Sequence, residues 1–315
     1  LQKVIGRPFP DAPLPLAGRS RELTDLALVL GQLGGEHALP PLLITGAAGV
    51  GKTRLAQEVL SRADVTVVRV VCPPNGGLYF HVPSTLIRLA MELPGLPSSE
   101  AAQEAIASAA RRYLPDDLHA PAFLGMLLGI PLPQNYIGLD PRSARLSAFS
   151  ACRSLLLSPW LRSGEGEVIL LVEDLEWADA GSIEFLEHLT RSPLPPRFAL
   201  VATSRPSAYP DPKRGRGEAW QQVPLEPLLT ADARDLLRSL SARKGLPDIV
   251  ESGLLEQSEG VPLALEEEFL AMTEEGLLVP ERLHYEFKGG PEELVAGRAR
   301  PFTEDEREVL AALAV

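Results

Sequence analysis

The chain contains little cysteine, few aromatic residues and no long apolar run. Only 2 of its 315 residues are cysteines, Cys72 and Cys152, and they stand too far apart for the paired spacing of a metal site. Isolated thiols favour a reducing compartment and argue against a disulfide framework, so we expect a cytoplasmic protein. No segment approaches the roughly 18 consecutive apolar residues that a membrane span needs, and no membrane partner is expected.

Basic charge is scarce in the last third of the chain. Residues 226–315 carry 20 acidic and 9 basic side chains, whereas residues 1–225 carry 22 and 21. A nucleic-acid platform concentrates lysine and arginine on one face, which is the opposite bias. We therefore expect no direct nucleic-acid binding by this segment.

Both ends of the sequence have the features of a piece of a longer protein. Leu1 is not a start methionine, and residues 309–315 stop inside an apolar helical pattern. We therefore expect other domains of the same chain to be partners of this segment.

A complete phosphate-binding motif lies near the N-terminus. Residues 46–53 read Gly-Ala-Ala-Gly-Val-Gly-Lys-Thr, which is the pattern G-x-x-x-x-G-K-[ST]. A short apolar run, 41–45, precedes it and predicts a strand, and residues 55–60 follow with helical spacing. Strand, loop and helix form the setting in which backbone N–H groups bind phosphates at a helix N-terminus. The nucleotide-binding residues predicted here are Gly46, Ala47, Ala48, Gly49, Val50, Gly51, Lys52, Thr53 and Arg54.

The motif also predicts which groups contact the phosphates and the metal. The ammonium of Lys52 reaches the β- and γ-phosphates, and the hydroxyl of Thr53 ligates Mg²⁺. An acidic partner is needed at the tip of a neighbouring strand, and Glu173 and Asp174 follow the apolar run 168–172. One carboxylate can hold Mg²⁺ and the other can align the attacking water, and the pattern leaves open which does which.

A cation stands at the end of the next predicted strand. Arg205 follows residues 198–203, at the strand end where an open α/β sheet binds ligands. From this place it can contact the γ-phosphate and register its loss. The predicted catalytic residues are therefore Glu173, Asp174 and Arg205, and the predicted metal ligands are Thr53 and Glu173.

Strands that alternate with helices predict an α/β fold. The predicted strands form a five-stranded parallel sheet flanked by helices, as in P-loop NTPases, and comprise residues 42–45, 65–71, 168–172, 198–203 and 221–225. Residues 1–15 are rich in proline and are predicted to be a linker. Residues 16–225 are the predicted nucleotide-binding domain, with a helical insertion over residues 72–167.

Three boxes of this sequence resemble those of the bacterial STAND ATPases, which are signal-transduction relatives of the AAA+ ATPases. Residues 171–179, Leu-Val-Glu-Asp-Leu-Glu-Trp-Ala-Asp, resemble the extended Walker B box of this family. Residues 18–23 match its Gly-Arg-x-x-Glu-Leu box, and residues 260–263 match its Gly-x-Pro box. The match is closest to large LuxR-type and antibiotic-regulator-type transcription activators and to modules behind nucleotide-cyclase domains. Glu173 replaces the usual aspartate.

The resemblance implies more of the architecture and of the nucleotide site. It implies a helical lid over residues 226–276, followed by the start of a winged-helix domain over residues 277–315. It places Leu16, Ala17 and Gly18 beside the adenine, with Pro262 packed on the base. The implied function is a slow, regulated, Mg²⁺-dependent ATPase that switches between ATP and ADP states in a larger bacterial regulatory protein. Transcription is the implied output, and signal-dependent self-association can accompany it.

Three alternatives remain open. A nucleotide-binding scaffold without turnover needs the same loop residues, so only a turnover assay separates it from an ATPase. An AAA+ DNA-remodelling or loader ATPase predicts a basic face and salt-sensitive DNA binding. A P-loop kinase for a small molecule predicts arginines clustered over the phosphates, and residues 226–275 hold no such cluster.

Overall fold

The chain divides into two compact units. The computed structural model describes residues 3–10, 16–74, 79–92, 99–136, 138–163, 166–206, 220–242, 244–281 and 284–288. The first unit comprises Leu1–Phe9, Thr24–Thr45 and Val59–Val223. The second comprises Pro10–Leu23, Gly46–Glu58 and Pro224–Val315. Among the helices of these described residues, none is long and apolar enough to cross a lipid bilayer.

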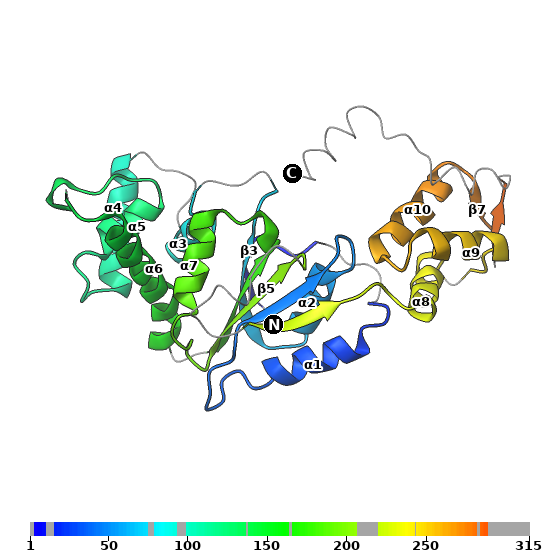
Figure 1. The fold of residues 1–315 in the computed structure, drawn as a ribbon, viewed down its shortest axis with the longest axis horizontal. Coiled ribbons are helices and arrows are strands. Elements are labelled where there is room, and N and C mark those ends of the chain that lie inside the picture. The colour runs from blue at the N-terminus through cyan, green and yellow to red at the C-terminus, as the bar shows by residue number, and fades with distance from the viewer. Residues whose placement is uncertain are drawn as a thin grey trace. The chain divides into compact units, whose positions relative to one another are not determined.

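A six-stranded sheet has the order β1-β3-β4-β5-β2-β6. Figure 1 labels β3 and β5 within this sheet. Its strands are β1 (Lys3–Gly6), β2 (Leu42–Gly46), β3 (Val65–Val71), β4 (Glu167–Glu173), β5 (Phe198–Ser204) and β6 (Gln221–Leu225). The pairs β1–β3, β3–β4, β4–β5 and β5–β2 are parallel. Because these strands are parallel, the carboxyl ends of β2, β4 and β5 lie at one edge, where ligands bind in open α/β sheets.

The five predicted strands are present, but the prediction of a five-stranded sheet is wrong by one strand. The predicted linker, 1–15, contains β1, which pairs in parallel with β3 along the edge of the sheet. Only four residues form β1, and its apolar pair, Val4 and Ile5, is too short to predict a strand beside the prolines that follow. The strand β6 is present but mostly exposed, because it is an edge strand with polar residues, whereas β2 and β5 are buried throughout.

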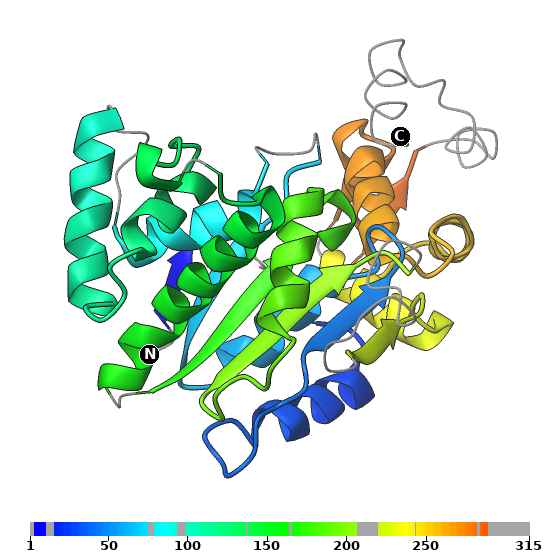
Figure 2. The ribbon, with the colours of Figure 1, turned by 60° about the vertical axis from the view of Figure 1, so that its left-hand side comes forward.

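Helices between β3 and β4 cover one face of the sheet (Figure 2). They are α3 (His81–Ala90), α4 (Ser99–Tyr113), α5 (Ala120–Leu127) and α6 (Pro141–Ser163), with the 3-10 turn η1 (Gln134–Tyr136) before α6. All four helices lie between the two strands, in the stretch where a helical insertion is predicted. With α7 (Ala180–Leu189), which follows β4 and the turn η2 (Leu175–Trp177), they bury one continuous core against β3, β4 and β5. Helices α1 (Ser20–Leu30) and α2 (Lys52–Ser61) each begin in the second unit and end in the first.

Three helices and a hairpin form the last part of the second unit. They are α8 (Thr230–Leu240), α9 (Asp248–Gln257), α10 (Pro262–Glu274) and the antiparallel pair β7 (Leu278–Pro280) and β8 (Tyr285–Phe287). Leucines and aromatic rings from these elements bury a core of their own, centred on Leu237, Leu254 and Phe269. The three helices lie within residues 226–276, and the assignment of these residues as a lid stays a prediction. The start of a winged-helix domain is predicted over residues 277–315, and residues 289–315 of this range lie outside the described residues.

Candidate nucleotide site

The phosphate-loop residues fold into a tight turn between β2 and α2. Gly49 and Gly51 have φ values of 72° and 100°, which side-chain-bearing residues rarely adopt. The α-helix begins directly afterwards, with Leu55 N donating to Gly51 O at 2.9 Å. The ammonium of Lys52 is buried and donates to the carbonyls of Gly46 and Ala47, both at 2.9 Å. The predicted lysine thus lies over its own loop, next to the N-terminus of α2.

The tip of the phosphate loop is bonded to the start of α10. Leu263 N donates to Gly49 O at 3.3 Å, and a Cβ on Gly49 would lie 2.9 Å from the Cβ of Leu263. Pro262 occupies the first turn of α10, where a missing N–H costs nothing. Two boxes that are distant in sequence, 46–53 and 260–263, therefore touch within the second unit.

The Gly18-Arg19 box holds the same loop from another side. Gly18 has a φ of 61° and lies so close to Asp232, at the start of α8, that a Cβ would approach Asp232 Cγ to 2.8 Å. Arg19 donates from one guanidinium nitrogen to Val50 O at 3.3 Å and to Glu226 O at 2.7 Å. Because Arg19 is also paired with Glu22 at 3.2 Å, its charge is compensated. The second unit thus joins the predicted adenine box, the phosphate loop and the chain entering α8.

The remaining predicted nucleotide contacts of the second unit are partly exposed. Leu16, Ala17 and Thr53 are half-buried, and Ala17 packs against the core of the three helices. Arg54 is paired with Glu58 on α2 at 2.9 Å, one helical turn away. Ala48, also in the loop, is exposed. The roles of these residues in ligand contact stay predictions.

The predicted magnesium acid lies in the first unit and is almost completely buried. Glu173, at the end of β4, is 1% exposed, and its Oε2 accepts a hydrogen bond from Arg69 Nε on the neighbouring strand β3. Its Oε1 is buried with no hydrogen-bond partner among the described residues. Ser204 Oγ, at the end of β5, is also buried and lacks a partner in the described part of the chain. Unsatisfied buried oxygens are costly, so these two acceptors fit a hydrated cation or another donor at this edge.

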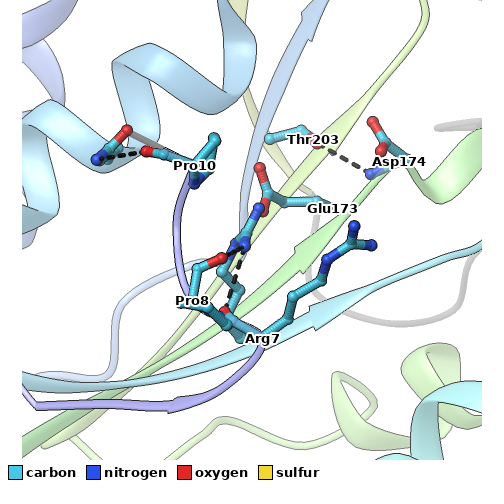
Figure 3. A network of polar contacts seen from close by, with 8 residues as sticks. Arg7, Pro8, Pro10, Glu173, Asp174 and Thr203 are labelled. Carbon is cyan, nitrogen blue, oxygen red and sulfur yellow. Dashed lines mark hydrogen bonds and ion pairs between the residues drawn. The ribbon is translucent and has the colours of Figure 1, made fainter. Parts of the chain in front are cut away.

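Asp174 is held differently from its neighbour. Its backbone is left-handed, with φ 57° and ψ 50°, which non-glycine residues adopt at some energetic cost. Asp174 N donates to the buried hydroxyl of Thr203 at 3.0 Å (Figure 3). The reversal at this residue turns the chain out of β4 directly after Glu173. Glu173 therefore ends the strand, and Asp174 forms the sharp bend that follows it.

Arg205 lies against the Walker-B-like box itself. Its Nε is 3.2 Å from Glu176 Oε1, and its backbone N–H donates to Glu176 Oε2, also at 3.2 Å. The guanidinium carbon lies 5.4 Å from the centroid of the Trp177 ring. Glu176 and Trp177 thus fix the side chain that was predicted to contact the γ-phosphate, and this role stays a prediction.

Asp179, the last residue of the box, joins two helix starts. Its carboxylate caps α7 by accepting from Ser182 N at 3.0 Å and also accepts the N–H groups of Phe80 and His81, at the start of α3. Burial raises the pKa of Asp179, but the hydrogen bonds from Ser182, Phe80 and His81 outweigh it and hold the pKa below its ordinary value. Asp179 thus connects the start of α7 with the start of α3.

Asp179→Ala is expected to destabilise the first unit by about 2 kcal/mol. The variant loses the carboxylate that caps α7 and that accepts the N–H groups of Phe80 and His81. Chemical denaturation followed by circular dichroism measures this change. Asp140→Ala is the matched control, because Asp140 caps α6 through Ser143 N at 2.9 Å on the protein surface. An equal loss in both variants would contradict the double role of Asp179.

The two cysteines are buried side chains of the first unit. Burial, together with the nearby charges of Asp174, Asp179 and Glu176, raises the pKa of Cys72 to about 12. Burial also raises the pKa of Cys152. Both thiols therefore stay protonated at neutral pH, as expected for structural cysteines.

Arg69 was not predicted as a functional residue. The signal was present in the sequence, because Arg69 stands in the run Val65–Val71, in which five of the seven residues are valines. An arginine inside a buried strand needs an acidic or carbonyl partner. The partner, Glu173, is on another strand and could be identified only from the pairing of β3 with β4.

Comparison with known proteins places the chain in a family. The family model described as "AAA ATPase domain" matches residues 15–201, which is more than half of the chain, and the chain belongs to this family. An uncharacterised protein of Rhizobium meliloti (strain 1021) is 31% identical over 202 residues, which are 61% of this chain and 19% of that protein. The chain thus spans about a fifth of that relative's length.

Two solved structures are similar at low identity. The ORC1 protein of Aeropyrum pernix, solved in complex with DNA, is 16% identical with a TM-score of 0.47, over 92% of this chain and 67% of that chain. A variant of RuvB from Thermotoga maritima is 13% identical with a TM-score of 0.44, over 92% of this chain and 72% of that chain.

Proposed function

We propose that this AAA ATPase domain binds ATP with Mg²⁺, hydrolyses it slowly and acts as a signal-transduction switch of a larger bacterial regulatory protein. The observation that carries the proposal is the bond from Leu263 N to Gly49 O. It connects the loop that binds the phosphates to the first turn of α10. A change at the γ-phosphate can therefore reach the helices of the second unit through a single hydrogen bond. Loops that respond to a γ-phosphate in this way are a known two-state device.

The proposed chemistry is in-line attack of water on the γ-phosphoryl group, with most of the acceleration from positioning and charge stabilisation. Lys52 and the backbone N–H groups of the loop hold the β- and γ-phosphates. Thr53 and Glu173 are the residues that would hold Mg²⁺, which neutralises charge on the phosphate oxygens when bound. Asp174 aligns the water and accepts its proton, and Arg205 contacts the γ-phosphate.

The proposed role in the longer protein rests on the STAND-like boxes and on the charge of this segment. Leu16, Ala17, Gly18 and Pro262 form the proposed adenine contacts, residues 226–276 the proposed lid, and residues beyond 277 the start of a winged helix. The proposed partners are ATP and the other domains of the same cytoplasmic chain, with transcription as the output and self-association upon activation. The acidic residues 226–315 disfavour the DNA-remodelling alternative.

Binding of ADP and ATP to the purified chain tests the first step. Lys52→Ala should weaken the affinity for Mg²⁺-ATP by roughly 10- to 100-fold, since a charge-assisted hydrogen bond to phosphate is worth about 1.5–3 kcal/mol. Lys244→Ala is the matched control: this lysine lies in the same unit, 5.8 Å from the Tyr285 ring centroid, far along the chain from the loop. Isothermal titration calorimetry gives both affinities. Equal affinities for the wild type and Lys52→Ala would contradict the proposed site.

A further inference from the structure

Arg69 is a buried cation at the centre of a small polar cluster in the first unit. It is 6% exposed and lies in a strand whose other residues are five valines and one threonine. Its Nε donates to Glu173, and another guanidinium nitrogen donates to the carbonyls of Arg7, at 3.2 Å, and Pro8. The guanidinium carbon lies 4.7 Å from the centroid of the Phe9 ring. One side chain therefore contacts both the predicted magnesium acid and the N-terminal segment.

The contact with Arg69 restricts what Glu173 can do. One carboxylate oxygen is occupied by Arg69, and the other has no partner among the described residues. A planar guanidinium bonded to one oxygen fixes the rotamer of the glutamate and leaves the second oxygen for a ligand. Glutamate is one methylene longer than the usual aspartate at this position, so it has an additional torsion to fix. Arg69 supplies that restraint.

The N-terminal segment is shaped to lie over Arg69. Gly6 is paired with Arg69 in the register of β1 and β3 and has a φ of 99°. A Cβ on Gly6 would collide with the carbonyl oxygen of Arg69, so only glycine allows this approach. The chain then turns so that the carbonyls of Arg7 and Pro8 point to the guanidinium near Glu173 (Figure 3).

We propose that Arg69 is a positioning residue, which holds Glu173 for Mg²⁺ and couples this acid to the N-terminal segment Arg7–Phe9. Displacement of that segment removes two carbonyls and a ring from Arg69. The arginine then has a larger choice of conformations, and Glu173 loses its fixed rotamer. Whatever precedes the segment in the longer protein can in this way change how tightly Mg²⁺-nucleotide is bound. This inference rests on the proposed function of Glu173 as a magnesium ligand.

The test is the Mg²⁺ dependence of nucleotide binding by the whole chain, measured with a fluorescent ADP analogue. In EDTA, Arg69→Met should bind the analogue within about twofold of the wild type, because the loop residues are intact. Addition of Mg²⁺ should raise the affinity of the wild type for the analogue, and this increase should be about tenfold smaller in Arg69→Met. Arg69→Lys, which keeps the charge but loses the planar fork, should give an intermediate value. Arg234→Met is the matched control, since Arg234 Nε pairs with Glu251 at 2.6 Å in the second unit.

A second variant keeps the test valid if Arg69→Met does not fold. Phe9→Ala leaves both charges in place and removes only the ring from the guanidinium, and it should reduce the Mg²⁺-dependent gain about two- to threefold. Amide hydrogen exchange of residues 3–10 should be faster in Phe9→Ala and Arg69→Lys than in the wild type. These readouts would not change together if the arginine only stabilised the sheet.

The outcomes separate the two proposals. A wild-type chain that binds no nucleotide contradicts the proposed function, and this inference with it. A wild-type chain with Mg²⁺-dependent binding that is unchanged in Arg69→Lys and Phe9→Ala contradicts the inference alone. A reduced Mg²⁺ gain in these variants, with unchanged binding in EDTA, supports it.

Discussion

Asp174→Asn is expected to lower ATP turnover by at least about 100-fold while nucleotide binding is retained, because a positioned general base contributes roughly 10²- to 10⁴-fold. The amide keeps the size of the side chain, and the backbone bond from Asp174 N to Thr203 Oγ1 does not involve the carboxylate. The bend after β4 is therefore preserved. Release of inorganic phosphate under saturating Mg²⁺-ATP measures the effect on kcat.

Comparison with Glu173→Gln assigns the two acids. If Glu173 holds the metal, Glu173→Gln should raise the Mg²⁺ concentration needed for half-maximal turnover, whereas Asp174→Asn should leave it unchanged. Asp235→Asn is the surface control, since the exposed carboxylate of Asp235 pairs with the exposed Arg238 on α8 at 3.0 Å. The reverse pattern, with a metal shift in Asp174→Asn alone, would exchange the two roles.

Glu173→Leu is expected to destabilise the chain by about 3–5 kcal/mol, because it leaves Arg69 buried without a carboxylate. For a protein of this size, such a loss corresponds to a fall of at least about 6 °C in the melting temperature. Differential scanning calorimetry measures it without any ligand. The effect is independent of ATP chemistry, so it tests the structure on its own.

A double variant identifies the cause of this loss. Arg69→Met combined with Glu173→Leu removes both charges and replaces them with apolar side chains of similar volume, which is often close to neutral for a buried pair. Most of the stability lost in Glu173→Leu should therefore return. If the loss of stability in the double variant equals the sum of the losses in the two single variants, the two side chains do not interact. That result would contradict the buried ion pair.

The phosphate loop and many of the strands and helices could be predicted from the sequence, because each is specified by residues that are close together in the chain. The loop 46–53 has a fixed spacing of glycines, lysine and threonine, and the apolar run 168–172 followed by Glu173 and Asp174 indicates a strand and its end. The helices α8 to α10 follow from the periodicity of their apolar residues. In each case neighbouring residues in the sequence carry the information.

What the sequence did not reveal depends on contacts between distant segments. The four residues of β1 are too few for a periodic signal and become a strand only by pairing with β3. Glu173 acquires Arg69 as a partner through the register of β3 and β4, and Arg205 acquires Glu176 through the chain reversal at Asp174. The bond between Leu263 and Gly49 likewise joins two boxes that lie at opposite ends of the sequence. None of these pairings is encoded in a local pattern.

Turnover of ATP by the purified chain with Mg²⁺, measured beside Lys52→Ala and in EDTA, tests the central claim most directly. We expect slow phosphate release by the wild type that is lost in EDTA and reduced at least about 100-fold in Lys52→Ala. Equal release by the wild type and Lys52→Ala would contradict the assignment of the phosphate loop as the site of hydrolysis. If the chain binds nucleotide but does not hydrolyse it, the proposed ATPase activity is wrong and the chain is a nucleotide-binding scaffold.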